Sequence, residues 1–296
     1  MKNILEKLNK NKKRVVTGTV LGLLVLFCAI TGGIPLLILV SLVCFFGTKE
    51  YVEILKHKGF LPSLNIILFN EAAFIALIAL KKYDAILFII TLGTILAFCS
   101  VLFKGKQPYI ANVATTVLGA IYCAFMPVHF ILIRQLNSDG MGLLRVVFND
   151  GLGFLMLTFF VVIFTDIGAY YFGSKFGKRP LAPVISPKKT IEGSIGGTLT
   201  AIIFGIIIGW FINLPWYHSF VASLIISAAA QLGDLSESLI KRDAGVKDSG
   251  NTLPGHGGFL DRCDSFIFAA PIAYYYFKFL VIDKHYLLDL FKIFHY

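Results

Sequence analysis

The sequence predicts an all-α, polytopic integral membrane protein that crosses the bilayer about nine times, with its N-terminus in the cytoplasm. Hydrophobic residues make up 57% of the 296 residues, charged residues make up only 15%, and the mean hydropathy is +0.79. A soluble domain averages about 45–50% apolar and about 25% charged residues. Both differences indicate a chain built from several membrane-spanning helices of about 20 apolar residues each.

Nine apolar segments are candidate helices. Gly32, Gly33 and Pro35 separate the first two segments, which favours a tight helical hairpin, and Pro127 and His129 interrupt the fifth. The first segment follows the basic N-terminus, and we interpret it as a retained helix because another apolar segment, not a soluble chain, comes next. The nine segments are 15–30, 34–48, 63–80, 84–103, 109–133, 152–172, 194–213, 219–235 and 265–282.

The positions of the 27 Lys and Arg residues predict the orientation of these helices. With the N-terminus in the cytoplasm and the sides alternating, most of them fall on the cytoplasmic side, as the positive-inside rule requires. The net charge of +10 is therefore assigned to topology and not to nucleic-acid binding. This orientation also places the polar segments 173–192 and 236–263 in the cytoplasm, where nucleotides and Mg²⁺ are available.

The two halves of the chain differ in polar content. Residues 1–150 are predicted to form N-terminal transmembrane helices, and residues 151–296 a C-terminal transmembrane catalytic domain that carries the cytoplasmic polar loops. The five cysteines include no C-x-x-C pair, so the sequence indicates neither a structural zinc site nor a redox motif.

A polar block from Ser236 to Asp264 is predicted to belong to an active site. Carboxylates close to hydrocarbon are costly and are functional candidates by default. Asp261 and Asp264 are three residues apart, so they share one face of a helix, and Asp234 ends the preceding apolar segment. Oxygen ligands of this kind suit Mg²⁺ or Mn²⁺. The alternative for the same residues is a set of salt bridges between helices.

Cations, hydroxyls and glycines around these carboxylates are candidates for binding phosphate. Glycines in LPGHGGF, residues 253–259, allow the backbone to approach a ligand closely. The earlier segment GKRPLAPVISPKKTIEGSIGG is stiffened by prolines and places cations beside a helix N-terminus, which favours anion binding; the alternative is a basic loop at the membrane surface. The substrate-binding candidates are Ser186, Lys188, Lys189, Thr190, Ser238, Lys247, Gly257, Gly258 and Arg262.

The segment SLIKRDAGVKDSGNTLPGHGGFLDRCD resembles the signature of the phosphatidate cytidylyltransferases, also called CDP-diacylglycerol synthases. SPKKTIEG and TDIGAYYFG also resemble motifs of that family. The resemblance covers roughly residues 160–275, and Cys263 departs from the residue types that the family usually has there. It implies transfer of CMP from CTP to phosphatidate, which gives CDP-diacylglycerol and pyrophosphate with the help of one or two divalent metal ions.

The resemblance also implies roles for particular residues. Asp234, Asp261 and Asp264 are expected to hold Mg²⁺ or Mn²⁺, while Asp248 and His256 enter the site by motif match alone. Asp166, inside an apolar segment, is expected either to join the polar site or to pair with a lysine. The implied catalytic residues are Asp234, Lys241, Arg242, Asp248, His256, Asp261 and Asp264.

Three other functions compete with this one. CTP with another lipid phosphate acceptor keeps the same site, because apolar spans say little about the lipid tail. A transporter or channel for an anionic solute predicts ionisable groups deep in several spans, and an inert scaffold predicts a broken set of carboxylates. The expected location is a bacterial plasma membrane with the site facing the cytoplasm, and no motif decides between a monomer and a homodimer.

Overall fold

The computed structural model describes residues 18–137, 150–250, 252 and 257–283, and helices account for most of them. A helix from Gly18 to Thr31 precedes the labelled elements. These are α2 (Gly33–His57), α3 (Leu64–Ala79), the 3₁₀ turn η1 (Tyr83–Ala85), α4 (Ile86–Lys104), α5 (Tyr109–Gly119), the π-helix η2 (Ala120–Phe125), α6 (His129–Gln135), α7 (Asp150–Phe176), β1 (Pro180–Ala182), β2 (Ser186–Thr190), α8 (Ile191–Phe211), α9 (Trp216–Asp243), α10 (Leu260–Tyr276) and the π-helix η3 (Phe277–Ile282).

Within the described ranges, seven helical segments are long and apolar enough to cross a membrane. Two further apolar helices, Gly18–Thr31 and Leu64–Ala79, are shorter. The nine predicted segments each overlap one of these helices, so the all-α membrane class agrees with the structure. The count of nine spans and the cytoplasmic N-terminus stay predictions, since residues 1–14 lie outside the described part. The seven are Gly33–His57, Tyr83–Phe103, Tyr109–Gln135, Asp150–Phe176, Ile191–Phe211, Trp216–Asp243 and Leu260–Ile282.

The fifth predicted segment, 109–133, is not one continuous α-helix. After α5 the chain passes through the wider π-helical turn η2 and then a turn before α6 begins at His129. Pro127 lies in that turn, and it has no amide hydrogen to continue an α-helical ladder. The proline that interrupts this segment in the sequence therefore marks a real break in the helix.

By its internal contacts the chain divides into two compact units, each built from separate stretches. Unit 1 comprises Met1–Phe125 and Leu239–Cys263, and unit 2 comprises Met126–Ser238 and Asp264–Tyr296. The predicted division near residue 150 concerns which half carries the catalytic residues, and it stays a prediction.

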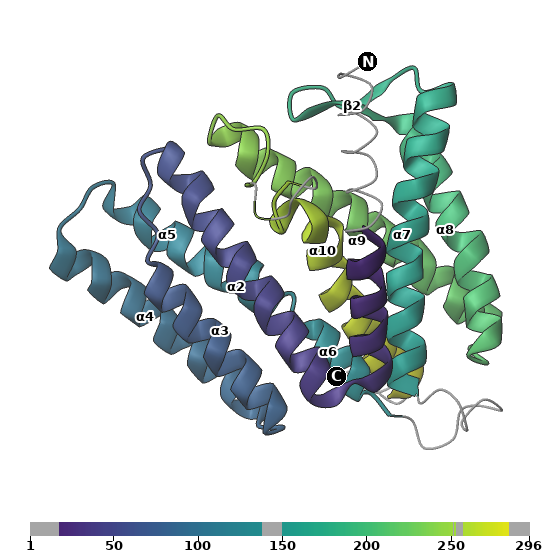
Figure 1. Cartoon of the computed structure of the whole chain (residues 1–296), viewed down its shortest axis with the longest axis horizontal. Helices are drawn as coiled ribbons and strands as arrows, with labels where there is room; N and C mark the ends of the chain where they lie inside the picture. The colour runs from purple at the N-terminus through teal and green to yellow at the C-terminus, as the bar shows by residue number, and fades with distance from the viewer. Residues whose placement is uncertain (1–17, 138–149, 251, 253–256, 284–296) are drawn as a thin grey trace, which may run out of the picture. The chain divides into compact units, whose positions relative to one another are not determined.

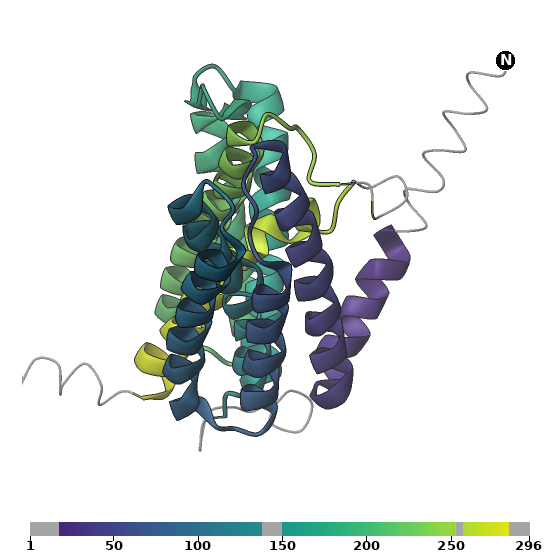
Figure 2. The same cartoon turned by 90° about the vertical axis from the view of Figure 1, so that its left-hand side faces the viewer.

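In unit 1, α3 contacts both α2 and α4, and α4 contacts α5 (Figures 1 and 2). The Tyr51 hydroxyl of α2 donates a hydrogen bond of 2.9 Å to the carbonyl oxygen of Thr115 in α5. Gly119 lies beside this ring, where an added Cβ would stand 2.7 Å from the Tyr51 ring and from Ile67. A buried tyrosine with a partner for its hydroxyl anchors α2 to α5.

In unit 2, the antiparallel pair β1 and β2 joins α7 to α8, and these two helices pack along each other (Figure 1). The sequence predicts only a stiff non-helical loop here, because strands this short depend on pairing with each other. The hydroxyl of Thr190 caps α8 by accepting a hydrogen bond of 3.1 Å from the amide of Gly193, which is the usual role of a threonine at that position. The cap ends the hairpin and begins α8 three residues earlier than predicted.

Small residues allow the close approach of α7 and α8. A Cβ at Gly197 would stand 2.6 Å from the carbonyl oxygen of Thr165 in α7. Gly197→Ala is therefore expected to lower the free energy of unfolding by about 1–3 kcal/mol, because overpacking forces the helices apart. Denaturant unfolding of the purified protein in detergent micelles measures this loss. Gly22→Ala is the control, since a Cβ at Gly22 meets nothing within 4 Å; equal losses in both variants would contradict the close-packing explanation.

Candidate active site

Unit 2 gathers three of its carboxylates and one lysine from four elements. The carboxylate of Asp234 in α9 forms an ion pair with Lys189 of β2. Asp166 in α7 interacts electrostatically with both of these side chains and with Ser265. Asp264 in α10 interacts with Asp234 and Asp166. The structure therefore brings Asp234, Asp264 and the SPKKT lysine together, and Asp166 joins them.

Backbone packing explains why Asp234 and Asp264 are neighbours. Gly233 of α9 lies against α10, and a Cβ there would stand 2.6 Å from the carbonyl oxygen of Asp264. Because no side chain separates the two backbones at this point, the residues next to the contact are held close. Glu237, one turn after Gly233, is buried and also interacts electrostatically with Asp264. It lies in the predicted block but is not one of the predicted site residues.

A polar network continues from this cluster between α8 and α9. The amide of Gln231 bonds to Ser194 at 2.5 Å and to Thr198 at 3.0 Å. Further along, Thr165 of α7 donates to the hydroxyl of Ser227 at 2.9 Å. Side chains of this kind in apolar helices find partners on neighbouring helices, since unpaired polar groups are costly there. The hydroxyls stand in apolar runs, so hydropathy alone did not identify them.

Unit 1 holds the third predicted carboxylate. Asp261 accepts a hydrogen bond of 2.5 Å from the Lys241 ammonium at one oxygen. Its other oxygen accepts from the backbone amides of Ser249 at 3.0 Å and Gly258 at 3.2 Å. Both members of the ion pair are nearly buried, with side chains 10% and 13% exposed. Asp261 thus holds together the end of α9, the loop and the start of α10.

Glu50 of α2 also contacts this loop, and the sequence analysis did not single it out. Its carboxylate accepts hydrogen bonds from the backbone amides of Phe259 at 2.9 Å and Leu260 at 2.8 Å. It also accepts from the hydroxyls of Ser249 at 3.1 Å and Thr252 at 2.5 Å. Glu50 stands in the apolar N-terminal half, far from any motif. The only available signal was a charged residue near the end of a predicted span.

The other predicted site residues lie mostly at the surface. Lys188, Arg242, Lys247, Asp248 and Arg262 are exposed, while Ser186, Lys189, Thr190 and Ser238 are partly buried. The Arg242 guanidinium donates to the carbonyl oxygen of Val246 at 3.1 Å. Gly257 has a φ of +85°, a conformation that favours glycine. His256 lies outside the described residues.

Two of the predicted carboxylates fit a divalent metal ion. Within the described ranges, no three His, Cys, Asp or Glu side chains converge closely enough to hold a metal ion by themselves. Mg²⁺ in phosphate chemistry usually takes only one or two carboxylates and fills its shell with substrate phosphates and waters. The pair Asp234 and Asp264 fits such an ion in donor type. Asp261 has a lysine and two amides as its neighbours, and its role as a metal ligand stays a prediction.

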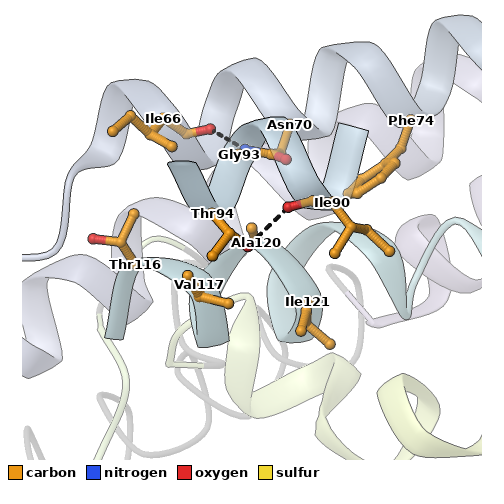
Figure 3. Close-up of a pocket in the computed structure, with 10 residues that line it drawn as sticks. All are labelled: Ile66, Asn70, Phe74, Ile90, Gly93, Thr94, Thr116, Val117, Ala120 and Ile121. Atoms are coloured by element: carbon orange, nitrogen blue, oxygen red, sulfur yellow. Dashed lines mark hydrogen bonds between the residues drawn. The ribbon is translucent and has the colours of Figure 1, made fainter. Parts of the chain in front are cut away.

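Two cavities in unit 1 lie away from these residues. A crevice among α3, α4, α5 and η2 is lined mainly by apolar side chains around Asn70 and Thr94, as Figure 3 shows. Its volume of about 10 Å³ is no more than the space of one water molecule, so it is a packing defect and not a substrate site. A larger cavity of about 360 Å³ includes Ser63, Lys106 and Asn112. Neither lining includes a predicted site residue.

Comparison with known proteins agrees with these motifs. The sequence profile of the cytidylyltransferase family matches residues 12–280. A phosphatidate cytidylyltransferase of Bacillus subtilis is 35% identical over 277 residues, which cover 89% of this chain and 96% of the relative. One from Synechocystis is 33% identical, covering 88% and 94%. A chloroplastic phosphatidate cytidylyltransferase of Arabidopsis thaliana is 31% identical, covering 92% and 75%.

Proposed function

The chain belongs to the cytidylyltransferase family, and from this membership we propose that it is a phosphatidate cytidylyltransferase. It transfers CMP from CTP to phosphatidate and produces CDP-diacylglycerol and pyrophosphate for phospholipid synthesis. Relatives from bacteria and from a plant that carry this name align over most of the chain. The observation in the structure that supports this activity best is the cluster of Lys189, Asp234 and Asp264 in unit 2.

The reaction makes simple demands on the protein. An oxygen of the phosphatidate phosphate attacks the α-phosphorus of CTP, a new P–O bond forms, and the bond to pyrophosphate breaks. Because the attacking oxygen is already anionic, no serine, cysteine or histidine nucleophile is needed. The protein has to bring together two highly charged phosphate groups, and to orient them in line. Catalysis therefore depends on positioning and on neutralisation of charge.

Lys189 and the two aspartates divide these tasks. Lys189 is held beside Asp234 and supplies a positive charge that binds a substrate phosphate. Asp234 and Asp264 would hold a divalent ion, which would neutralise the charge on the phosphate oxygens. Lys188 in unit 2 and Arg242, Lys247 and Arg262 in unit 1 are exposed cations, and their positive charge attracts the triphosphate or the lipid phosphate to the protein.

The proposed function requires these groups to lie on the side of the membrane where CTP is available. We assign the polar segments 173–192 and 236–263 to the cytoplasmic side of a bacterial plasma membrane, with the N-terminus on the same side. The support is the excess of Lys and Arg in these segments and in residues 1–14, as the positive-inside rule requires. Phosphatidate then reaches the site from the cytoplasmic leaflet and CTP from the cytoplasm.

The test is an assay of the purified protein in phosphatidate-containing vesicles with CTP and Mg²⁺. Formation of CDP-diacylglycerol together with an equal amount of pyrophosphate is expected, and omission of phosphatidate, CTP or Mg²⁺ is expected to abolish both. An isoprenoid phosphate offered instead of phosphatidate tests the closest alternative. Preference for that acceptor, or turnover with neither lipid, would contradict the proposal.

A further inference from the structure

We propose that Glu50 is a positioning residue for the catalytic signature: from α2 it binds Ser249, Thr252, Phe259 and Leu260, and through them it orients Asp261 and Lys241. This inference rests on the proposed function, because it assigns Glu50 a role in that reaction. Glu50 is not part of the signature motif, and it precedes Ser249 by 199 residues.

Glu50 is only 6% exposed and stands in a helix long and apolar enough to span a membrane. A carboxylate buried in such surroundings is costly unless its oxygens are hydrogen-bonded. Four donors satisfy it, and all four come from one short segment: two side-chain hydroxyls and two backbone amides. Among the residues that the structure describes, the hydrogen-bond partners of this carboxylate of α2 therefore all belong to the signature segment.

The two backbone donors explain what Glu50 does for α10. Phe259 and Leu260 stand at the start of this helix, where amide groups have no partner within the helix. A carboxylate beside them satisfies these amides and interacts favourably with the helix dipole. Glu50 of α2 thus caps the N-terminus of α10 and fixes the direction in which α10 begins.

Asp261 is the next residue after these two donors, so its orientation depends on them. Ser249 connects the two carboxylates directly: its hydroxyl donates to Glu50, and its amide donates to Asp261. Removal of Glu50 therefore releases both the first turn of α10 and Ser249, whose amide bonds the second oxygen of Asp261. Lys241, bound to the other oxygen, is affected through Asp261.

The glycines of the loop fit this arrangement. A Cβ at Gly258 would stand 2.6 Å from one oxygen of Glu50, and a Cβ at Gly250 would stand 3.0 Å from the other. Both positions require a residue without a side chain so that the loop can approach the carboxylate. Part of the glycine pattern of the signature is thereby explained by Glu50 and not by a substrate phosphate.

The test uses the full-length protein in micelles and compares Glu50→Gln with Glu53→Gln. Glutamine keeps the shape of glutamate, but its amide nitrogen cannot accept hydrogen bonds from the loop. Glu53 lies on the same helix, is exposed, and pairs only locally with Lys56. For Glu50→Gln we expect kcat to fall about 100-fold while the KM for CTP changes less than about threefold, because misplacement affects the chemical step more than binding. Glu50→Asp, which keeps the charge, is expected to recover part of kcat.

Hydrogen exchange provides the readout that does not depend on activity. In Glu50→Gln the amides of Phe259 and Leu260 are expected to exchange at least about tenfold faster, while the exchange of α3 and α4 and the unfolding midpoint stay as in the wild type. Unchanged kcat, unchanged exchange at these two amides, or equal losses in Glu53→Gln would each overturn the proposal. If the wild-type protein transferred no CMP, the proposed function would fail, and exchange alone would decide the role of Glu50.

Discussion

Asp264→Asn is expected to reduce kcat/KM for CDP-diacylglycerol formation by about 100- to 1000-fold, the usual cost of removing a group that stabilises charge in the transition state. Initial rates over a range of CTP and Mg²⁺ concentrations measure the loss. The same variant is expected to keep or raise its free energy of unfolding. Asp264 stands among the carboxylates of Asp166, Asp234 and Glu237, and neutralising one of several like charges relieves repulsion.

This combination separates a functional carboxylate from a structural one. A side chain that only stabilises the fold loses stability and activity together, whereas natural active sites often retain groups that reduce stability. Asp283→Asn is the matched control, because Asp283 follows η3 in the same stretch of chain and is exposed. Wild-type activity in Asp264→Asn, or a matching loss of stability, would remove Asp264 from the proposed metal site.

The second large effect is expected at Lys241. Lys241→Met leaves the Asp261 carboxylate without its ammonium partner in a nearly buried position, which costs about 3 kcal/mol of folding free energy. Activity is expected to fall as well, because Asp261 and the loop amides bound to it lose their orientation. The double variant Lys241→Met with Asp261→Asn removes both charges and is expected to regain most of the stability but none of the activity.

Denaturant unfolding and initial rates on the single and double variants measure these two effects separately. Lys58→Met is the control in the same unit, since Lys58 pairs with Asp243 across an exposed contact of 3.0 Å. A surface ion pair is worth at most about 1 kcal/mol, so this variant is expected to stay close to the wild type. If the double variant regained activity along with stability, Lys241 and Asp261 would be a structural pair only.

The apolar helices were predictable because lipid restricts what a spanning segment can be. A helix pairs its backbone polar groups inside the segment, as lipid requires, and apolar runs of about 20 residues such as 84–103 and 152–172 have the length of a spanning helix. Pro127 indicated the break after α5, because proline has no amide hydrogen to continue an α-helix. The hairpin β1–β2 was not predictable in this way, because its strands have three and five residues and pair only with each other.

The candidate site was predictable in part. Asp234 and Asp264 stood out because carboxylates at the ends of apolar runs are costly without a function, and the structure brings them together in unit 2. The pairing of Asp234 with Lys189 depends on the hairpin, which no local pattern indicates. The resemblance implied a catalytic role for Lys241, and the structure adds that its ammonium is bonded to Asp261. Spacing identifies which charges share a face of a helix, and says nothing of which partner each charge takes.

The sequence by itself determined the membrane class, the positions of most helices and the chemistry of the signature, since hydropathy and motif order are local properties. Only the tertiary structure decided how the signature is held. Glu50 belongs to no motif, and nothing in the sequence around it indicates its partners. Its oxygens nevertheless accept hydrogen bonds from residues about 200 positions away. A buried carboxylate must be hydrogen-bonded, and its partners are the donors that the fold places beside it. Tertiary packing, and not local sequence, therefore determines which donors these are.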